Sequence, residues 1–185
     1  QVGLVGSEMC IRDRYNRKEM KKELEKRHAA GDATFSHFSF DANLLTELED
    51  CFRNYSEQGT CRYRHYIHNS SEENLYGAKP GNFTKWKKFE EPSDLLFYEG
   101  LHGAVVNEEI NLARYADLKI GVVPVINLEW IQKIHRDTDS RGYSTEAVTD
   151  TILRRMHAYV HCICPQFTET DSNFQRVPVV DTSKP

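Results

Sequence analysis

The 185-residue sequence lacks long apolar runs, internal repeats and the common nucleotide-binding loops. Its apolar runs are all far shorter than the ~20 residues of a membrane-spanning helix, so we expect no membrane partner. Neither GxxxxGK[ST] nor GxGxxG occurs. The sequence therefore offers no glycine-rich loop whose backbone N–H groups could surround a phosphate.

An excess of positive charge is also missing. The chain has 24 basic and 28 acidic residues, giving a formal net charge of −4. Because nucleic-acid-binding domains usually carry a basic surface, we expect no nucleic-acid partner. The five cysteines are odd in number and irregularly spaced. This pattern favours reduced thiols and a cytoplasmic protein over a disulfide framework.

The two ends differ from the rest of the chain. Residues 4–14, LVGSEMCIRDR, resemble the translation of a sequencing adapter. We interpret residues 1–14 as foreign sequence and residues 15–185 as one partial domain. The chain stops directly after the strand-like VPVV of residues 177–180, so we expect a domain truncated at both ends.

Hydrophobic periodicity predicts two helices in the first third of the chain. Residues 16–30 place Met20 and Leu24 one turn apart. Residues 41–55 form the second, with Asp41 as the expected N-cap. The apolar stripe of the second helix is expected to consist of Leu44, Leu45, Leu48 and Phe52.

The next segment predicts a strand and then a loop. Residues 60–68, TCRYRHYIH, alternate enough to indicate a strand at a sheet edge. Residues 69–92 are polar and contain two glycines and two prolines, which indicates a long loop. Long loops in compact domains are often functional.

The remainder alternates strands with helices. The continuous apolar runs at 95–98 and 118–126 are typical of strands buried on both faces of a parallel sheet. Helices are predicted at 127–137 and 145–164, with Ser144 as the N-cap of the second. This alternation predicts an α/β sheet covered by helices.

A carboxylate stands at the exit of the first buried strand. Glu99 follows the apolar run 95–98 and precedes a Gly-containing turn. Ligands of open α/β sheets bind at the carboxyl ends of the strands, so Glu99 is a candidate ligand for a nucleotide-bound magnesium ion. The alternative is a carboxylate that only caps a helix or lies in a loop.

A basic cluster follows the second strand. Lys133, Arg136 and Asp137 are spaced i, i+3 and i+4, so they share one helix face. Two cations can neutralise phosphate charge, while the carboxylate can hold a metal or orient Lys133. The alternative is an ordinary surface ion-pair face. Four further residues could suggest zinc, but their spacing favours packed thiols: His157, His161, Cys162 and Cys164.

Several long motifs resemble one known family. They are RYNRKEMKKELEKRHAAGDATFSHFS, PGNFTKW, LLFYEGLHGAVV, DLKIGVVPVINLEWIQKIHRD, RGYSTEAVTDTILRRMHAYV and PQF…NFQRVPVVDTSKP. Together they span residues 14–185 and resemble the bacterial, octameric class of phosphoribulokinase. The resemblance implies a P-loop nucleotide-kinase-like fold of three layers with a mixed central sheet. It also implies transfer of the ATP γ-phosphoryl group to O1 of D-ribulose 5-phosphate in the Calvin cycle.

The resemblance assigns roles to individual residues. Glu99 and Asp137 match metal-site carboxylates, and Asp137, Lys133 and Arg136 match catalytic residues. Contacts to the sugar phosphate are implied for three residues: Arg17, His68 and Arg141. Arg155 matches a residue of allosteric control, in which NADH activates and AMP inhibits. The implied cofactors are ATP and Mg²⁺, and the implied assembly is a homo-oligomer.

The chain departs from the family pattern at its start. Cys10 stands where the family has its catalytic base Asp, and Asp13 stands where it has a substrate-binding His. Losing a general base typically costs 10²–10⁴ in rate, so we expect the polypeptide as written to be inactive. Two other readings are a related kinase of uridine or another small hydroxylated substrate, and a non-catalytic module that binds an anion.

Overall fold

The computed structural model describes residues 2–5, 14–89 and 91–177, with only the backbone described at 2–5, 140, 141 and 176. The helices are α1 (Arg17–Ala29), α2 (Leu45–Gln58), α3 (Ser70–Tyr76), α4 (Ile126–Arg141) and α5 (Thr145–Ala158). The strands are β1 (Val2–Val5), β2 (Arg62–Tyr63), β3 (Lys87–Lys88), β4 (Leu95–Tyr98), β5 (Ile120–Pro124) and β6 (Ser172–Arg176). Helices and strands are thus intermixed, as the α/β prediction requires.

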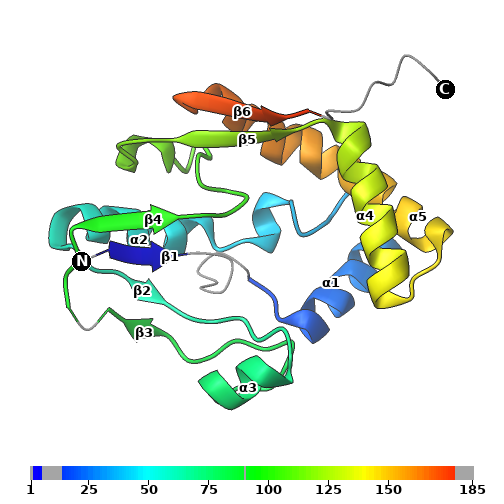
Figure 1. The fold of residues 1–185 in the computed structure, drawn as a ribbon, viewed down its shortest axis with the longest axis horizontal. Coiled ribbons are helices and arrows are strands. Elements are labelled where there is room, and N and C mark those ends of the chain that lie inside the picture. Colours follow the sequence, from blue (N-terminus) through cyan, green and yellow to red (C-terminus); the bar gives the residue numbers. More distant parts are fainter. Residues whose placement is uncertain (1, 6–13, 90, 178–185) are drawn as a thin grey trace.

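The described strands pair in twos. β1 runs parallel to β4, β5 runs parallel to β6, and β2 pairs antiparallel with β3. Figure 1 shows the two parallel pairs one above the other, with the β2–β3 pair and α3 at the opposite end from β6. Strand β1 falls within residues 1–14, whose foreign origin remains an expectation.

Helix α1 begins where the sequence predicted. Asn16 is its N-cap and forms a capping box, because its side chain accepts from the Glu19 amide while the Glu19 carboxylate accepts from the Asn16 amide. Met20 is buried against Phe35 and Ala42. The i, i+4 stripe of this helix therefore faces a small cluster of its own.

Helix α2 carries the main core. Its apolar stripe packs as predicted. Leu44, at the N-cap, is partly buried, the other three members are buried, and the buried Cys51 joins them. The prediction that Asp41 caps this helix is wrong, because the helix begins four residues later, at Leu45. Asp41 instead lies in the 3-10 turn Phe40–Ala42, where its carboxylate accepts a hydrogen bond from Arg27 at 2.6 Å.

Two predictions for residues 60–92 are wrong in their extent. The strand covers only Arg62–Tyr63, with one further bridge between Tyr66 and Phe83. The long loop contains helix α3, whose N-cap Asn69 accepts from the Glu72 amide, and strand β3. The N-x-x-E spacing of residues 69–72 was the signal for this helix.

The two central strands are correctly located but are not buried on both faces. Leu95 and Phe97 of β4 are 54% and 55% exposed, and Val122 of β5 is 71% exposed. Because side chains alternate along a strand, Leu95 and Phe97 share one face of β4, and Ile120 and Val122 share one face of β5. These two faces are uncovered in the part of the chain that the structure describes.

The C-terminal helices differ at their ends. Helix α4 extends past the predicted range to Arg141 and ends at Gly142, so Arg141 is the last helical residue and not part of a loop. Helix α5 starts after its N-cap Ser144, as predicted, but at Ala158 it gives way to the π-helical segment Tyr159–Ile163. Residues 178–180 of the VPVV run lie outside the described residues. No described helix has both the length and the apolar character to span a bilayer.

Candidate active site

Helix α4 brings Lys133, Arg136 and Asp137 together as the i, i+3, i+4 spacing predicts. Lys133 Nζ donates to Oδ2 of Asp137, and Arg136 Nε donates to Oδ1 at 3.0 Å. The Asp137 side chain is buried, at 6% exposed, whereas the Arg136 side chain is 56% exposed. The cluster thus has a buried anionic centre with a cation that solvent reaches.

The charge state of Asp137 follows from this geometry. Burial raises the pKa of the carboxyl, but the hydrogen bonds from Lys133 and Arg136 outweigh burial and lower the pKa to about 2. The group is therefore ionised throughout the neutral range. A carboxylate of this kind is a poor proton acceptor and a good anchor for two cations.

Arg155 on α5 lies on the same side of the structure as this cluster. Helices α4 and α5 pack against each other, and Asp137 acts electrostatically on Arg155. Burial and the neighbouring Arg154 lower the pKa of Arg155, while the charge of Asp137 opposes that shift. Its guanidinium lies 5.8 Å from the Phe38 ring centroid. Arg155 thus lies within electrostatic range of the α4 cluster, whereas Arg154 is half-buried and pairs with Asp150 at 2.8 Å.

A second group forms at the start of α1. Arg17 occupies the first turn, and its side chain donates a long hydrogen bond of 3.4 Å to the His68 carbonyl oxygen. Its backbone amide donates to the Gly81 carbonyl at 2.9 Å. The His68 amide donates to Glu72 at 2.8 Å. Two of the three predicted sugar-phosphate residues, 51 positions apart, are thus neighbours. The third, Arg141, has a side chain outside the described residues.

Glu99 lies directly after β4 and is exposed. In the described part of the chain it makes no hydrogen bond or ion pair with the α4 cluster. The segment behind it is held by Gln166, whose amide group accepts from the Ala104 N–H at 3.1 Å and donates to the Leu101 carbonyl at 3.0 Å. Sequence reasoning missed Gln166, because nothing local marks a glutamine that bonds residues more than 60 positions away.

The two candidate metal ligands differ in how well they suit a hard cation. The exposed carboxylate of Glu99 fits Mg²⁺, which prefers oxygen ligands. Both oxygens of Asp137 accept from cationic side chains, so Lys133 would have to release Oδ2 before a metal could bind there. Among residues 14–89 and 91–177, no group of three or more His, Cys, Asp or Glu side chains is arranged to hold a metal.

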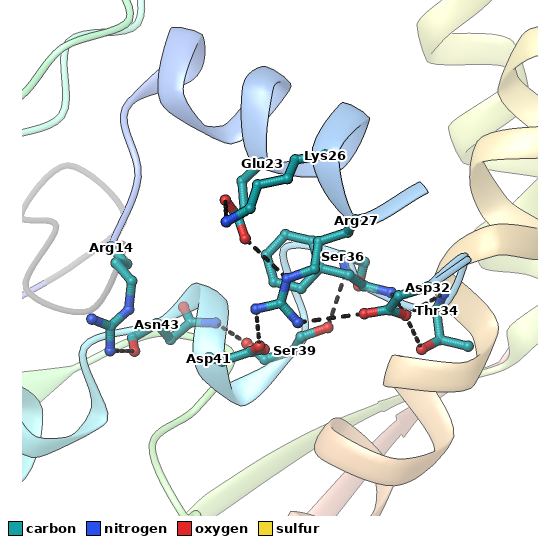
Figure 2. A network of polar contacts seen from close by, with 11 residues as sticks. Arg14, Glu23, Lys26, Arg27, Asp32, Thr34, Ser36, Ser39, Asp41 and Asn43 are labelled. Carbon is teal, nitrogen blue, oxygen red and sulfur yellow. Dashed lines mark hydrogen bonds and ion pairs between the residues drawn. The ribbon is translucent and has the colours of Figure 1, made fainter. Parts of the chain in front are cut away.

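The C-terminal half of α1 is held in place by a polar network around Arg27 (Figure 2). The guanidinium bonds Glu23 at 2.9 Å, Asp41 at 2.6 Å and Asp32 at 3.4 Å, and it lies 4.6 Å from the Phe35 ring centroid. These bonds raise the pKa of Arg27. The network joins α1, which carries Arg17, to the segment that leads into α2.

A pocket of about 310 Å³ lies beside this network. Its lining includes Arg27 and Asp41 of the network together with His157 and His161. None of the predicted site residues lines it. The predicted site is therefore distributed over the start of α1, the exit of β4 and one face of α4, and it is not contained in this pocket.

Known proteins resemble this chain throughout. The sequence model of the "Phosphoribulokinase / Uridine kinase family" matches residues 2–183. "Phosphoribulokinase 2" of Cereibacter sphaeroides is 70% identical over 172 residues, which cover 93% of this chain and 59% of that protein. The "Phosphoribulokinase" of Nitrobacter vulgaris is 63% identical over the same shares.

A solved structure agrees with these matches. The structure titled "Phosphoribulokinase from Rhodobacter spheroides" superposes with a TM-score of 0.85 at 64% identity, covering 100% of this chain and 63% of the other. This confirms the predicted α/β, P-loop-kinase-like fold. The chain spans less than two thirds of the length of these relatives.

Proposed function

Because the chain belongs to the phosphoribulokinase/uridine kinase family, we propose that it supplies part of the active site of a phosphoribulokinase. The reaction is transfer of the ATP γ-phosphoryl group to O1 of D-ribulose 5-phosphate, giving ribulose 1,5-bisphosphate in the Calvin cycle. The observation that carries this proposal is the 70% identity to a protein named phosphoribulokinase, across 93% of the chain.

Each group of the site has a role in this reaction. Phosphoryl transfer depends almost entirely on positioning and charge stabilisation, with little covalent chemistry for the protein. Lys133 and Arg136 would neutralise charge on the transferring group, and Asp137 would hold both cations in register. The ion pairs on α4 and the low pKa of Asp137 support this division of labour.

The remaining groups bind. Arg17, His68 and Arg141 would hold the sugar phosphate, and the contact of Arg17 with the His68 carbonyl supports the first two. Glu99 would be a ligand of Mg²⁺, and Asp137 would be the second metal carboxylate once Lys133 released its Oδ2 atom. Bound Mg²⁺ would supply charge neutralisation between the nucleotide phosphates.

A chimera tests this function. The 172 aligned residues of Cereibacter sphaeroides phosphoribulokinase 2 would be replaced by those of this chain. ADP release that requires both ATP and D-ribulose 5-phosphate is the expected result. Lys133→Met in the chimera should lower kcat by about 10²–10³, the usual effect of losing a group that stabilises transition-state charge.

Arg154→Met is the matched control, because Arg154 is a half-buried cation on the neighbouring helix α5 and, like Lys133, pairs with an aspartate one helical turn away, here Asp150. It should leave kcat unchanged. A folded chimera without D-ribulose 5-phosphate-dependent turnover would refute the proposed function. Equal activity of the two variants would refute the role of Lys133.

The 185-residue polypeptide by itself is expected to be inactive, since Cys10 stands at the position of the family's catalytic base. The same ADP-release assay on the purified chain checks this, and measurable turnover would contradict it. A non-catalytic anion-binding role gains support only if the chimera is also inactive but the chain still binds the sugar phosphate.

A uridine kinase is the second candidate, because the matching family includes such enzymes. A nucleoside has no phosphate for Arg17 and His68 to bind, so their proximity favours the phosphorylated sugar. Uridine in place of D-ribulose 5-phosphate in the chimera assay separates the two.

Regulation, assembly and location are further parts of the proposal. NADH as activator and AMP as inhibitor would act through Arg155, whose electrostatic coupling to Asp137 supports a link to the site. We also propose a homo-oligomer and a cytoplasmic location. The four described cysteines are free thiols, which is consistent with a reducing compartment.

A further inference from the structure

A glycine controls how Arg17 sits beside His68. Gly81, in the segment after α3, is buried and has φ +83°, a backbone conformation that residues with a side chain rarely adopt. A Cβ atom built on Gly81 would lie 3.1 Å from Arg17 Cβ and 3.3 Å from Arg17 Nε. The stem of Arg17 therefore lies directly against the position where any other residue would place its side chain.

The backbone around Gly81 is held firmly. Its amide donates to the Ile67 carbonyl at 2.6 Å, and the Ile67 amide donates to the Asn82 carbonyl at 2.9 Å. Ile67 is completely buried, so these two hydrogen bonds cannot shift without disturbing the interior. The Gly81 carbonyl then accepts from the Arg17 amide at 2.9 Å. Gly81 thus links the start of helix α1 to the end of the 60–68 segment by one hydrogen bond to each.

The consequence for Arg17 follows from these contacts. The main chain of Gly81 is fixed on both sides, so an added Cβ atom requires the Arg17 stem to give by a few tenths of an ångström. The hydrogen bond from the guanidinium to the His68 carbonyl is already long at 3.4 Å, so even a small shift of the stem is expected to weaken it. Both Arg17 and His68 are exposed, which leaves this pair open to a ligand.

We propose that Gly81 is a positioning residue for binding of the substrate phosphate, acting through Arg17. This inference rests on the proposed function, in which Arg17 and His68 bind the phosphate of D-ribulose 5-phosphate. Gly81 touches Arg17 and not the substrate, and its contribution is the absence of a side chain combined with a carbonyl that anchors the start of α1.

The chain contains matched controls for the backbone strain. Gly31 has φ +86° and Gly77 has φ +73°, and a Cβ atom on either would meet nothing within 4 Å. Gly31→Ala and Gly77→Ala therefore introduce the same unfavourable backbone conformation without the contact to Arg17. Any effect that Gly81→Ala has beyond these two variants comes from the crowding of Arg17.

Binding of D-ribulose 5-phosphate by the purified chain, followed by calorimetry, is the first measurement. Gly81→Ala should weaken binding about tenfold, the usual loss for a hydrogen bond to a charged group. Gly31→Ala and Gly77→Ala should bind within about twofold of the unsubstituted chain. In the Arg17→Gln background, Gly81→Ala should not weaken binding further, because the guanidinium that Gly81 positions has already been removed.

Hydrogen exchange of the Arg17 amide is the second measurement and needs no ligand. Gly81→Ala should accelerate this exchange, and Gly31→Ala should not. The inference is overturned if Gly81→Ala matches the control variants in both measurements, or if it weakens binding equally in the Arg17→Gln background. Failure of the unsubstituted chain to bind the sugar phosphate would count against the proposed function, while the exchange comparison would still decide whether Gly81 positions Arg17.

Discussion

Replacement of Asp137 by asparagine should destabilise the folded chain by about 2 kcal/mol at pH 7. The pKa of Asp137 falls from the ordinary 3.8 to about 2 in the folded chain, and each pKa unit corresponds to ~1.4 kcal/mol. The carboxylate is almost fully buried, whereas Lys133 keeps 21% and Arg136 keeps 56% of its side-chain surface exposed. Water can therefore partly hydrate the two cations when the carboxylate is lost. The loss of unfolding free energy should then be smaller than for a fully buried ion pair.

The effect should disappear in acid. Because the folded-state pKa is lower than the unfolded-state value, the ionised carboxylate contributes its full stabilisation above about pH 4. That contribution is lost as the pH falls towards 2, where the folded state also takes up the proton. The stability difference between Asp137 and its asparagine variant should therefore shrink steadily over this range.

Urea unfolding followed by circular dichroism, at low protein concentration and without divalent cations, measures both effects. Asp150→Asn is the matched control, since Asp150 forms an i, i+4 ion pair with Arg154 on α5 and both side chains are exposed. Exposed pairs contribute about 0.5 kcal/mol or less. Equal destabilisation by the two variants, or a pH-independent difference for Asp137→Asn, would refute the assignment of Asp137 as a buried anchor.

Three further outcomes are expected. Arg27→Met should lower the unfolding free energy by about 1 kcal/mol, because it removes a partly buried network of ion pairs. Lys26→Met, the control, should change it by less than about 0.5 kcal/mol. Equal urea midpoints for the two variants would contradict this. Gln166→Leu should lower the unfolding free energy by about 2 kcal/mol and accelerate hydrogen exchange of the Ala104 amide, since a buried backbone group loses its partner. An Ala104 amide that stays protected from exchange in this variant would rule out the hydrogen bond. Phe97→Ser should weaken self-association in sedimentation velocity, because Phe97 is 55% exposed, and an unchanged association constant would point to another face.

Local sequence patterns predicted the parts of the site that lie within one element. Lys133 and Asp137 are one helical turn apart, so any helix through them brings their side chains together. Ser144 was predicted as the N-cap of α5 because its hydroxyl can accept from an amide three residues on, and it does. Both depend on geometry that repeats within about four residues.

Patterns that depend on partners far away in the chain were predicted poorly. Asp41 is a residue type that often caps helices, but its carboxylate accepts a hydrogen bond from Arg27 instead. Helix α2 starts four residues later, at Leu45. The apolar runs of β4 and β5 indicated strands buried on both faces, yet burial depends on which segments cover them. An apolar run shows that a segment is suited to burial, but it does not show which other segments pack against it.

The sequence by itself determined the charge cluster on α4, the apolar stripe of α2, the N-cap of α5 and the family resemblance, since these depend on residue identity and short spacing. Only the tertiary structure decided that Arg17 bonds the His68 carbonyl, 51 positions away in the sequence, and that Gly81 lies against the Arg17 side chain. It also decided that Gln166 secures the segment after Glu99. Such contacts depend on the packing of the whole chain, because each joins groups that no local periodicity relates.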